Sequence, residues 1–245
     1  MRLTEMSGTC YRTSISVLGR PGGGIRWVLI PTIHMGHADY YWEIWQRLRT
    51  CQAVIAEQYD GPSSTGLAYI TAMRWTGQRV ARQLVHQDID YGALDVPIIF
   101  PDAHLGPEAR PDRRLPRETW AGLAVMTPVL AIQMALTGSG LVEGMTSLEL
   151  TDESRPRFAD DYLTRVILTE RDDLLLDAIG EIDGEFAAEN MEVAVVFGAL
   201  HIPVVVRELR RIGHRVEPGT RWLTAIDFDE PPYLRKPSLD GWMDW

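Results

Sequence analysis

The sequence has few cysteines and no long apolar run, and each shortage excludes a class of protein. The 245 residues include two cysteines, Cys10 and Cys51, which are too few for a disulfide framework. No window approaches the roughly 18 continuous apolar residues that a membrane span needs. The first 15 residues also lack an apolar segment of signal-peptide length. These absences predict a cytoplasmic protein with no membrane partner.

Positive charge is scarce, and two catalytic motifs are missing. Lysine and arginine number 24 against 34 acidic residues, a net charge of −10, which argues against a nucleic-acid partner. Residues 22–24 are three glycines, but they precede a predicted strand instead of joining a strand to a helix. They therefore do not form a phosphate-binding loop. The chain also contains no Gly-x-Ser-x-Gly motif for a nucleophilic serine.

Two apolar runs each stop at a histidine. Residues 28–33 precede His34 and residues 195–200 precede His201, and a helical pattern follows each histidine. We interpret both runs as buried strands. Open α/β sheets bind ligands outside the carboxyl ends of their strands. The pattern therefore predicts that these two histidines meet in one site.

The remaining pattern predicts an α/β fold. Strands over 9–18 and 25–33 form an opening β-hairpin, and apolar spacing predicts a helix that begins at an Asp39 cap. A third strand over 51–56 completes a strand–helix–strand unit with parallel strands. Further elements are expected as strands over 96–100 and 193–197, helices over 65–85, 156–180 and 201–212, and a closing edge hairpin of 215–217 with 222–226. We predict a central mixed, largely parallel sheet flanked by helices, in one domain over 1–230, with a Pro-rich tail at 231–245.

Four predicted strands end on residues that can bind metals or carry protons. These residues are His34, Glu57, Asp102 and His201. Parallel strands would place all four at one edge of the sheet. Two imidazoles with carboxylates suit a divalent metal such as Zn, Mn, Fe or Co. They equally suit acid–base chemistry without a metal, so both alternatives stay open.

Arg171 occupies an unusual position, because it shares the apolar stripe of its predicted helix. A guanidinium that faces a core must be paired. One interpretation is a structural ion pair with a nearby acid such as Glu57. The other is that Arg171 reaches the strand-end site and holds a substrate carboxylate or a developing oxyanion.

Other polar residues receive ordinary interpretations. His37 is taken either as a support for the site or as a surface residue, and His104 lies near Asp102 in a polar loop. Asp172 and Asp173 are interpreted as solvated charges on a helix.

The order of the motifs resembles the TraB/TIKI family, in the wider erythromycin-esterase and ChaN-like group. The matching segments are Thr32-Ile33-His34, the strand 51–57 that ends on Glu57, Glu170-Arg171-Asp172, and Gly198-Ala199-Leu200-His201. The segment 87–91 leading to Asp102 also looks similar, and the resemblance covers roughly residues 10–226. One position departs from the family pattern, because Pro31 stands where the family has glycine.

The resemblance implies an EreA/ChaN-like fold and a metal-dependent hydrolase, peptidase or esterase-like. His34, His201 and Glu57 would bind a Mn, Co, Zn or Fe ion, with Glu57 as ligand or general base. Arg171 would stabilise the oxyanion, and Asp102 would orient a histidine or water. The substrate would be a peptide or small molecule, and a homodimer stays open. The alternatives are a non-catalytic protein that binds haem or a small ligand, and a tailoring enzyme that acts on a peptide or natural product.

Overall fold

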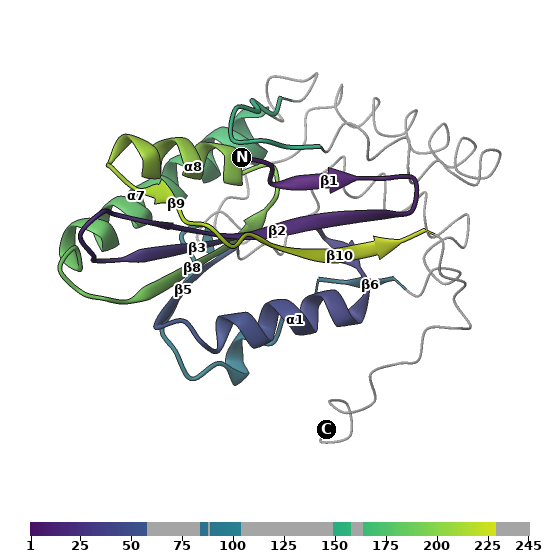
Figure 1. The fold of residues 1–245 in the computed structure, drawn as a ribbon, viewed down its shortest axis with the longest axis horizontal. Helices are drawn as coiled ribbons and strands as arrows, with labels where there is room; N and C mark the ends of the chain where they lie inside the picture. The colour runs from purple at the N-terminus through teal and green to yellow at the C-terminus, as the bar shows by residue number, and fades with distance from the viewer. Residues whose placement is uncertain (58–83, 88, 104–148, 158–163, 229–245) are drawn as a thin grey trace.

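The computed structural model describes residues 1–57, 84–87, 89–103, 149–157 and 164–228 (Figure 1). The helical elements are α1 (Ala38–Leu48), the 3-10 turn η1 (Tyr91–Ala93), the π-helical turn η4 (Thr164–Thr169), α7 (Glu170–Glu185) and α8 (Ile202–Arg211). The strands are β1 (Thr4–Met6), β2 (Cys10–Gly19), β3 (Arg26–Thr32), β4 (Met35–Gly36), β5 (Ala53–Ala56), β6 (Val85–His86), β7 (Ile98–Ile99), β8 (Glu192–Gly198), β9 (Arg215–Val216) and β10 (Arg221–Asp227).

The described strands form a mixed sheet, as the sequence predicts. The order β3-β8-β5-β7 is parallel throughout, and β2 joins β3 in antiparallel pairing. The predicted unit of β3, α1 and β5 needs one correction, because β8 lies between its two strands. An apolar run predicts that a strand is buried, but it does not indicate the order of the strands in the sheet.

Helices cover both faces of the sheet (Figure 1). Tyr40, Ile44 and Leu48 of α1 pack on the face that carries Val28 and Ile30 of β3. The apolar sides of α7 and α8 pack on the opposite face, with the alternate strand residues that include Leu29, Val195 and Phe197. This alternation follows from the two-residue period of a strand. Each large apolar side chain buried in this way contributes roughly 1.5–3 kcal/mol.

The opening hairpin is confirmed. β2 pairs with β3 from Ser16 opposite Leu29 to Gly19 opposite Arg26. Gly24 lies in the connecting turn with φ of 103°, and a Cβ there would approach the carbonyl oxygen of Ala187 to 2.6 Å. Glycine is therefore required by both backbone conformation and space. β1 was not predicted, because three residues are too short to show a period.

Several predicted element boundaries are wrong. α1 begins at Ala38 with His37 at its N-cap, so Asp39 lies in the first turn and is not the cap. The helix predicted over 156–180 is α7, which begins at Glu170 after η4 and continues to Glu185. The helix predicted over 65–85 lies almost entirely outside the described residues, and its end forms β6. The tail 231–245 also lies outside them.

The predicted closing hairpin is also wrong. β9 and β10 both pair antiparallel with β2, and they follow one path along it. Pro218, which has no backbone N–H, and Gly219, with φ of 104°, interrupt this path between the two strands. A strand broken by Pro and Gly has the same sequence pattern as a hairpin turn.

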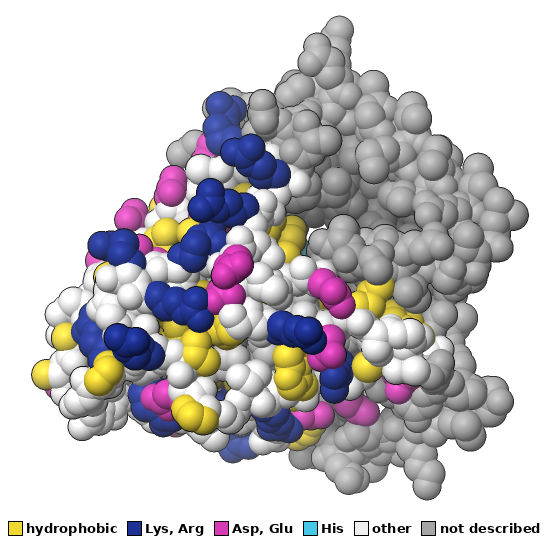
Figure 2. Space-filling model, turned by 45° about the horizontal axis from the view of Figure 1, so that its top comes forward, with side chains coloured by type: hydrophobic (Ala, Val, Ile, Leu, Met, Phe, Trp, Pro, Cys, Tyr) yellow, Lys and Arg dark blue, Asp and Glu magenta, His cyan; other side chains and the backbone are white. Residues whose placement is uncertain are grey.

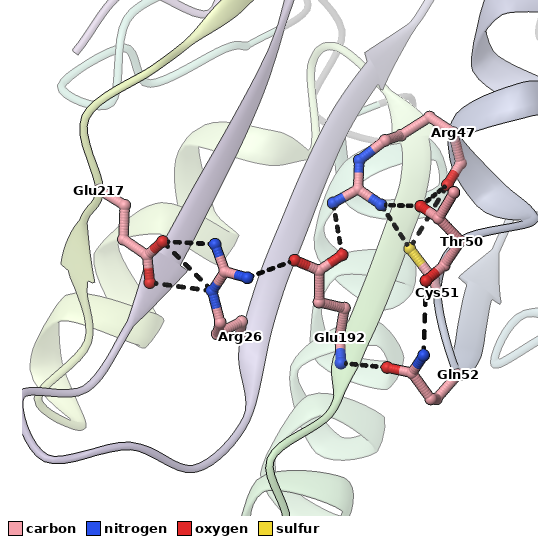
Figure 3. A network of polar contacts seen from close by, with 7 residues as sticks. All are labelled: Arg26, Arg47, Thr50, Cys51, Gln52, Glu192 and Glu217. Carbon is pink, nitrogen blue, oxygen red and sulfur yellow. Dashed lines mark hydrogen bonds and ion pairs between the residues drawn. The ribbon is translucent and has the colours of Figure 1, made fainter.

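An arginine–carboxylate network ties together the edge of the sheet where β3 and β8 begin (Figure 3). Arg26 binds Glu217 and Glu192, each with a closest N–O distance of 2.6 Å, and Arg47 binds the other oxygen of Glu192 at 2.6 Å. Cys51 packs beside Arg47, and burial raises the pKa of its thiol to about 11. A thiol with such a pKa is a poor nucleophile.

None of the described helices is long and apolar enough to cross a membrane.

Candidate active site

Four candidate residues follow the carboxyl ends of four parallel strands. His34 follows β3, Glu57 directly follows β5, Asp102 follows β7, and His201 follows β8. Because these strands are parallel to one another, their carboxyl ends lie at one edge of the sheet. The location proposed from the sequence therefore agrees with the strand order.

Glu57 lies at the centre of this edge and is buried. Its Oε2 accepts a hydrogen bond of 2.6 Å from the backbone N–H of Gly198. A Cβ on Gly198 would lie 3.2 Å from the same oxygen, so glycine permits this close approach. Burial alone would raise the pKa of Glu57. The charges of Arg171, His201 and His34 and the Gly198 hydrogen bond outweigh it and lower the pKa to about 2. Glu57 is thus a stable anion and a weak base.

Arg171 of α7 joins two strand ends. Its Nη2 lies 2.6 Å from Oε1 of Glu57 and also contacts Oδ2 of Asp102, to which Nε donates a bond of 3.0 Å. Burial lowers the pKa of Arg171, but the charges of the two carboxylates raise it above its usual value. The ion pair with Glu57 is therefore present, and action on an oxyanion stays a prediction. Asp102 binds Arg171, and its expected role in orienting a histidine or water stays a prediction.

His201 is buried at the N-cap of α8 and makes a second contact with α7. Its Nδ1 lies 2.7 Å from Oδ1 of Asp172, the residue that follows Arg171 on α7. The interpretation of Asp172 as a solvated charge is wrong, whereas Asp173 is exposed. The motif Glu170-Arg171-Asp172 carried the signal, because adjacent residues on a helix reach neighbouring points of one site.

Of the other histidines, His34 lies at the site and His37 lies away from it. His34 is exposed, and its charge contributes to the low pKa of Glu57, so it lies on the open side of the cluster. His37 is buried, and its Nε2 accepts a bond of 3.0 Å from the backbone N–H of Asp227. His37 therefore fixes the start of α1 against β10 and is not a surface residue. His104 lies outside the described residues.

Pro31, the departure from the family pattern, fits the end of β3. Pairing of β3 with β2 ends at Leu29, and the carbonyl of Pro31 accepts a bond of 3.1 Å from the Tyr40 hydroxyl. On that side of β3, no ladder bond depends on an N–H at position 31. Thr32 still pairs with Gly198, so β3 and β8 end side by side.

Tyr91 is a candidate that sequence reasoning missed. Burial and the charges of Glu57 and Asp102 raise the pKa of the Tyr91 hydroxyl, while an interaction with the side chain of Gln87 lowers it. The buried oxygen of Tyr91 has no hydrogen bond of good geometry within the described residues, and the same holds for Oγ1 of Thr32. Buried polar atoms nearly always have partners, so both hydroxyls are candidates to bind a ligand, a water or a residue outside the described part of the chain. The only sequence signal was the similarity of segment 87–91 to the family.

The predicted metal ligands do not fit a metal ion well. Within the part of the chain that the structure describes, no three His, Cys, Asp or Glu side chains are grouped as ligands. Both oxygens of Glu57 already accept bonds from donors, and one donor is a guanidinium at 2.6 Å. A divalent cation on Glu57 would meet the positive charge of Arg171 at close range. The donor set therefore favours the acid–base alternative.

Comparison of the chain with protein-family models, with curated proteins and with solved structures gave no match. The resemblance to the TraB/TIKI family stays a prediction, and the site is interpreted below from its own geometry.

Proposed function

We propose that this protein is a hydrolase of esters or amides in which His201, rather than a metal ion, activates water. The contact of 2.7 Å between His201 Nδ1 and Asp172 Oδ1 carries this proposal. Asp172 is an acceptor, so we assign the proton of the imidazole to Nδ1. Nε2 then has a free lone pair and acts as a general base, as in other histidine–carboxylate pairs.

Tyr91 and His34 supply the remaining hydrogen bond and proton transfer of the reaction. His201 takes a proton from water, and the water oxygen attacks the carbonyl carbon of the substrate. The Tyr91 hydroxyl donates a hydrogen bond to the carbonyl oxygen as negative charge develops there. His34, on the exposed side of the cluster, gives a proton to the leaving group as the bond breaks. These assignments use the buried hydroxyl of Tyr91 and the exposure of His34.

Arg171 is a positioning residue in this proposal. Two carboxylates engage its Nε and Nη2, so the three groups together carry one negative charge. A net negative cluster favours the positive charge that His201 gains when it accepts a proton, and it opposes an oxyanion. We therefore assign the oxyanion to Tyr91 instead of Arg171.

Hydrolysis of a panel of p-nitrophenyl esters and acyl p-nitroanilides tests the proposal. His201→Asn should lower kcat/KM on the order of 10²–10⁴-fold, because it removes the general base. His214→Asn is the matched control, because His214 forms the other buried histidine–aspartate contact, 2.8 Å from Nε2 to Asp183, beyond the far end of α8. Circular dichroism confirms that each variant folds.

The control should retain the activity of the wild type. Equal activity of His201→Asn and wild type would contradict the proposal, as would the absence of turnover on every ester and amide.

A further inference from the structure

A cleft of about 320 Å³ opens beside Asp172, on the side of the molecule formed by α7, α8 and residues 149–157. Arg155, Arg157 and Arg207 line it together with apolar side chains that include Leu168 and Leu200. Figure 2, in which the top of Figure 1 comes forward, shows Lys and Arg side chains gathered over this part of the molecule, with Asp and Glu side chains among them. The volume lies within the range of pockets that hold small organic ligands.

The arginines of this arginine cleft form no ion pair within the part of the chain that the structure describes. Among the residues that the structure describes, no acidic side chain forms a salt bridge with Arg155, Arg157 or Arg207. By contrast, Arg210 on the same helix as Arg207 pairs with Asp152. Asp172 is the acid among the described lining residues, and its carboxylate contacts Nδ1 of His201. The lining carries three arginines against one carboxylate, a net charge of +2, which is unusual in a chain with a net charge of −10.

Arg207 is also held in place. Its Nη1 donates bonds of 3.1 and 2.9 Å to the carbonyl oxygens of Asp152 and Ser154. These bonds fix the guanidinium without neutralising it, since carbonyl groups carry no net charge. A guanidinium held in one position loses less entropy when it binds a ligand.

We propose that the arginine cleft binds the carboxylate or phosphate of a small organic anion, with the apolar part of that molecule against Leu168 and Leu200. Arginine presents a planar set of donors that matches both groups. Asp172 lines the cleft and orients His201, so a bound anion lies beside the general base. The further step, that this anion is the substrate, rests on the proposed hydrolase function. The binding of the anion does not.

Isothermal titration calorimetry with phenyl phosphate and benzoate tests the cleft, with benzyl alcohol as the neutral probe. Arg155→Gln/Arg157→Gln is the main variant, because both side chains are exposed and the substitutions should therefore leave the fold intact. At low salt it should weaken binding of the anions at least about ten-fold, as expected when charged hydrogen bonds are lost. Arg207→Gln should weaken binding similarly. Arg221→Gln, at an exposed ion pair with Glu43, removes the same charge and should change binding less than about two-fold.

Three results would overturn the inference: no saturable binding of either anion, equal binding of benzyl alcohol, or an equal loss in Arg221→Gln. The two anions separate a phosphate preference from a carboxylate preference. Titration of His201→Asn with the same anions tests the arginine cleft in a protein that lacks the proposed general base, so the two proposals are tested separately. Anion binding without any hydrolysis by the wild type would defeat only the proposed function. Hydrolysis of neutral esters without anion binding would defeat only the arginine cleft.

Discussion

The imidazole of His201 and the carboxylate of Asp172 come from two different helices, and their Nδ1 and Oδ1 atoms lie 2.7 Å apart. On α7 the residue before Asp172 is Arg171, which binds Glu57 at the end of β5. One turn of α7 therefore carries both the partner of His201 and the arginine that binds Glu57. A shift of this helix would disturb both, so the geometry of the site depends on how α7 packs on the sheet.

Asp172→Asn should lower kcat on the order of 10²–10⁴-fold while the protein stays folded. The amide can donate a hydrogen bond to Nδ1, which favours the wrong tautomer of His201 and removes the charge that stabilises the imidazolium. Ester hydrolysis under saturating substrate measures the effect. Asp173→Asn removes the same charge from an exposed neighbour and should leave kcat within about two-fold. Equal losses in both variants would show that Asp172 acts only through its charge on the helix.

Arg171→Met should lower the free energy of unfolding by about 3–5 kcal/mol, because it leaves the buried carboxylates of Glu57 and Asp102 without a counter-charge. Urea unfolding measures the change. Arg171→Met/Glu57→Gln/Asp102→Asn removes the charges as well and should recover part of the loss. Arg26→Met, whose side chain is 47% exposed, should cost at most about 1 kcal/mol. A similar cost at both arginines would mean that Asp102 and Glu57 are not buried anions.

The low pKa of Glu57 makes stability depend on pH in acid. Its pKa is about 2 in the folded protein against an ordinary value of 4.5. Between these values the unfolded chain binds a proton that the folded chain does not, so stability rises with pH. The contribution is complete above pH 4.5, at most about 3 kcal/mol, and is lost as the pH falls through 2.

Urea unfolding of the wild type and Glu57→Gln between pH 7 and pH 2 isolates this effect. The stability difference between the two proteins should shrink as the pH falls below 4.5. A difference that stays constant over the whole range would show that Glu57 titrates normally in the folded protein.

Tyr91→Phe should lower kcat on the order of 10–10³-fold, because it removes the proposed donor to the oxyanion. The free energy of unfolding should change by less than about 1 kcal/mol, since the buried hydroxyl has no hydrogen bond of good geometry within the described residues. A large loss of stability with unchanged kcat would identify Tyr91 as a structural residue.

The sequence predicts at which edge of the sheet the site lies, but it does not predict which strands and side chains lie next to one another there. Apolar runs that stop at His34, Glu57 and His201 predict buried strands, and parallel pairing then places their ends at one edge. The place of β8 between β3 and β5 could not be predicted, because the pattern of one strand does not encode its neighbours. The start of α7 was predicted too early, since residues 156–157 lie in irregular structure and residues 164–169 form the separate turn η4.

The roles of Asp172 and Tyr91 required the structure. An aspartate on a helix is usually solvated, and only the arrival of His201 from α8 makes Asp172 its partner. Tyr91 lies in the short turn η1, where no apolar period indicates which side chains turn inward. The low pKa of Glu57 likewise depends on Arg171, which is remote in sequence, so the sequence alone left general base and ligand as its roles.

Hydrolysis by metal-stripped protein tests the central claim most directly. The protein is dialysed against a chelator, its metal content is measured by mass spectrometry, and kcat/KM on the best p-nitrophenyl ester is compared before and after. Activity that persists in the stripped wild type and is lost in stripped His201→Asn is the predicted result. Activity that disappears on stripping and returns with Mn²⁺ or Co²⁺ would contradict the account and restore His34, Glu57 and His201 as metal ligands.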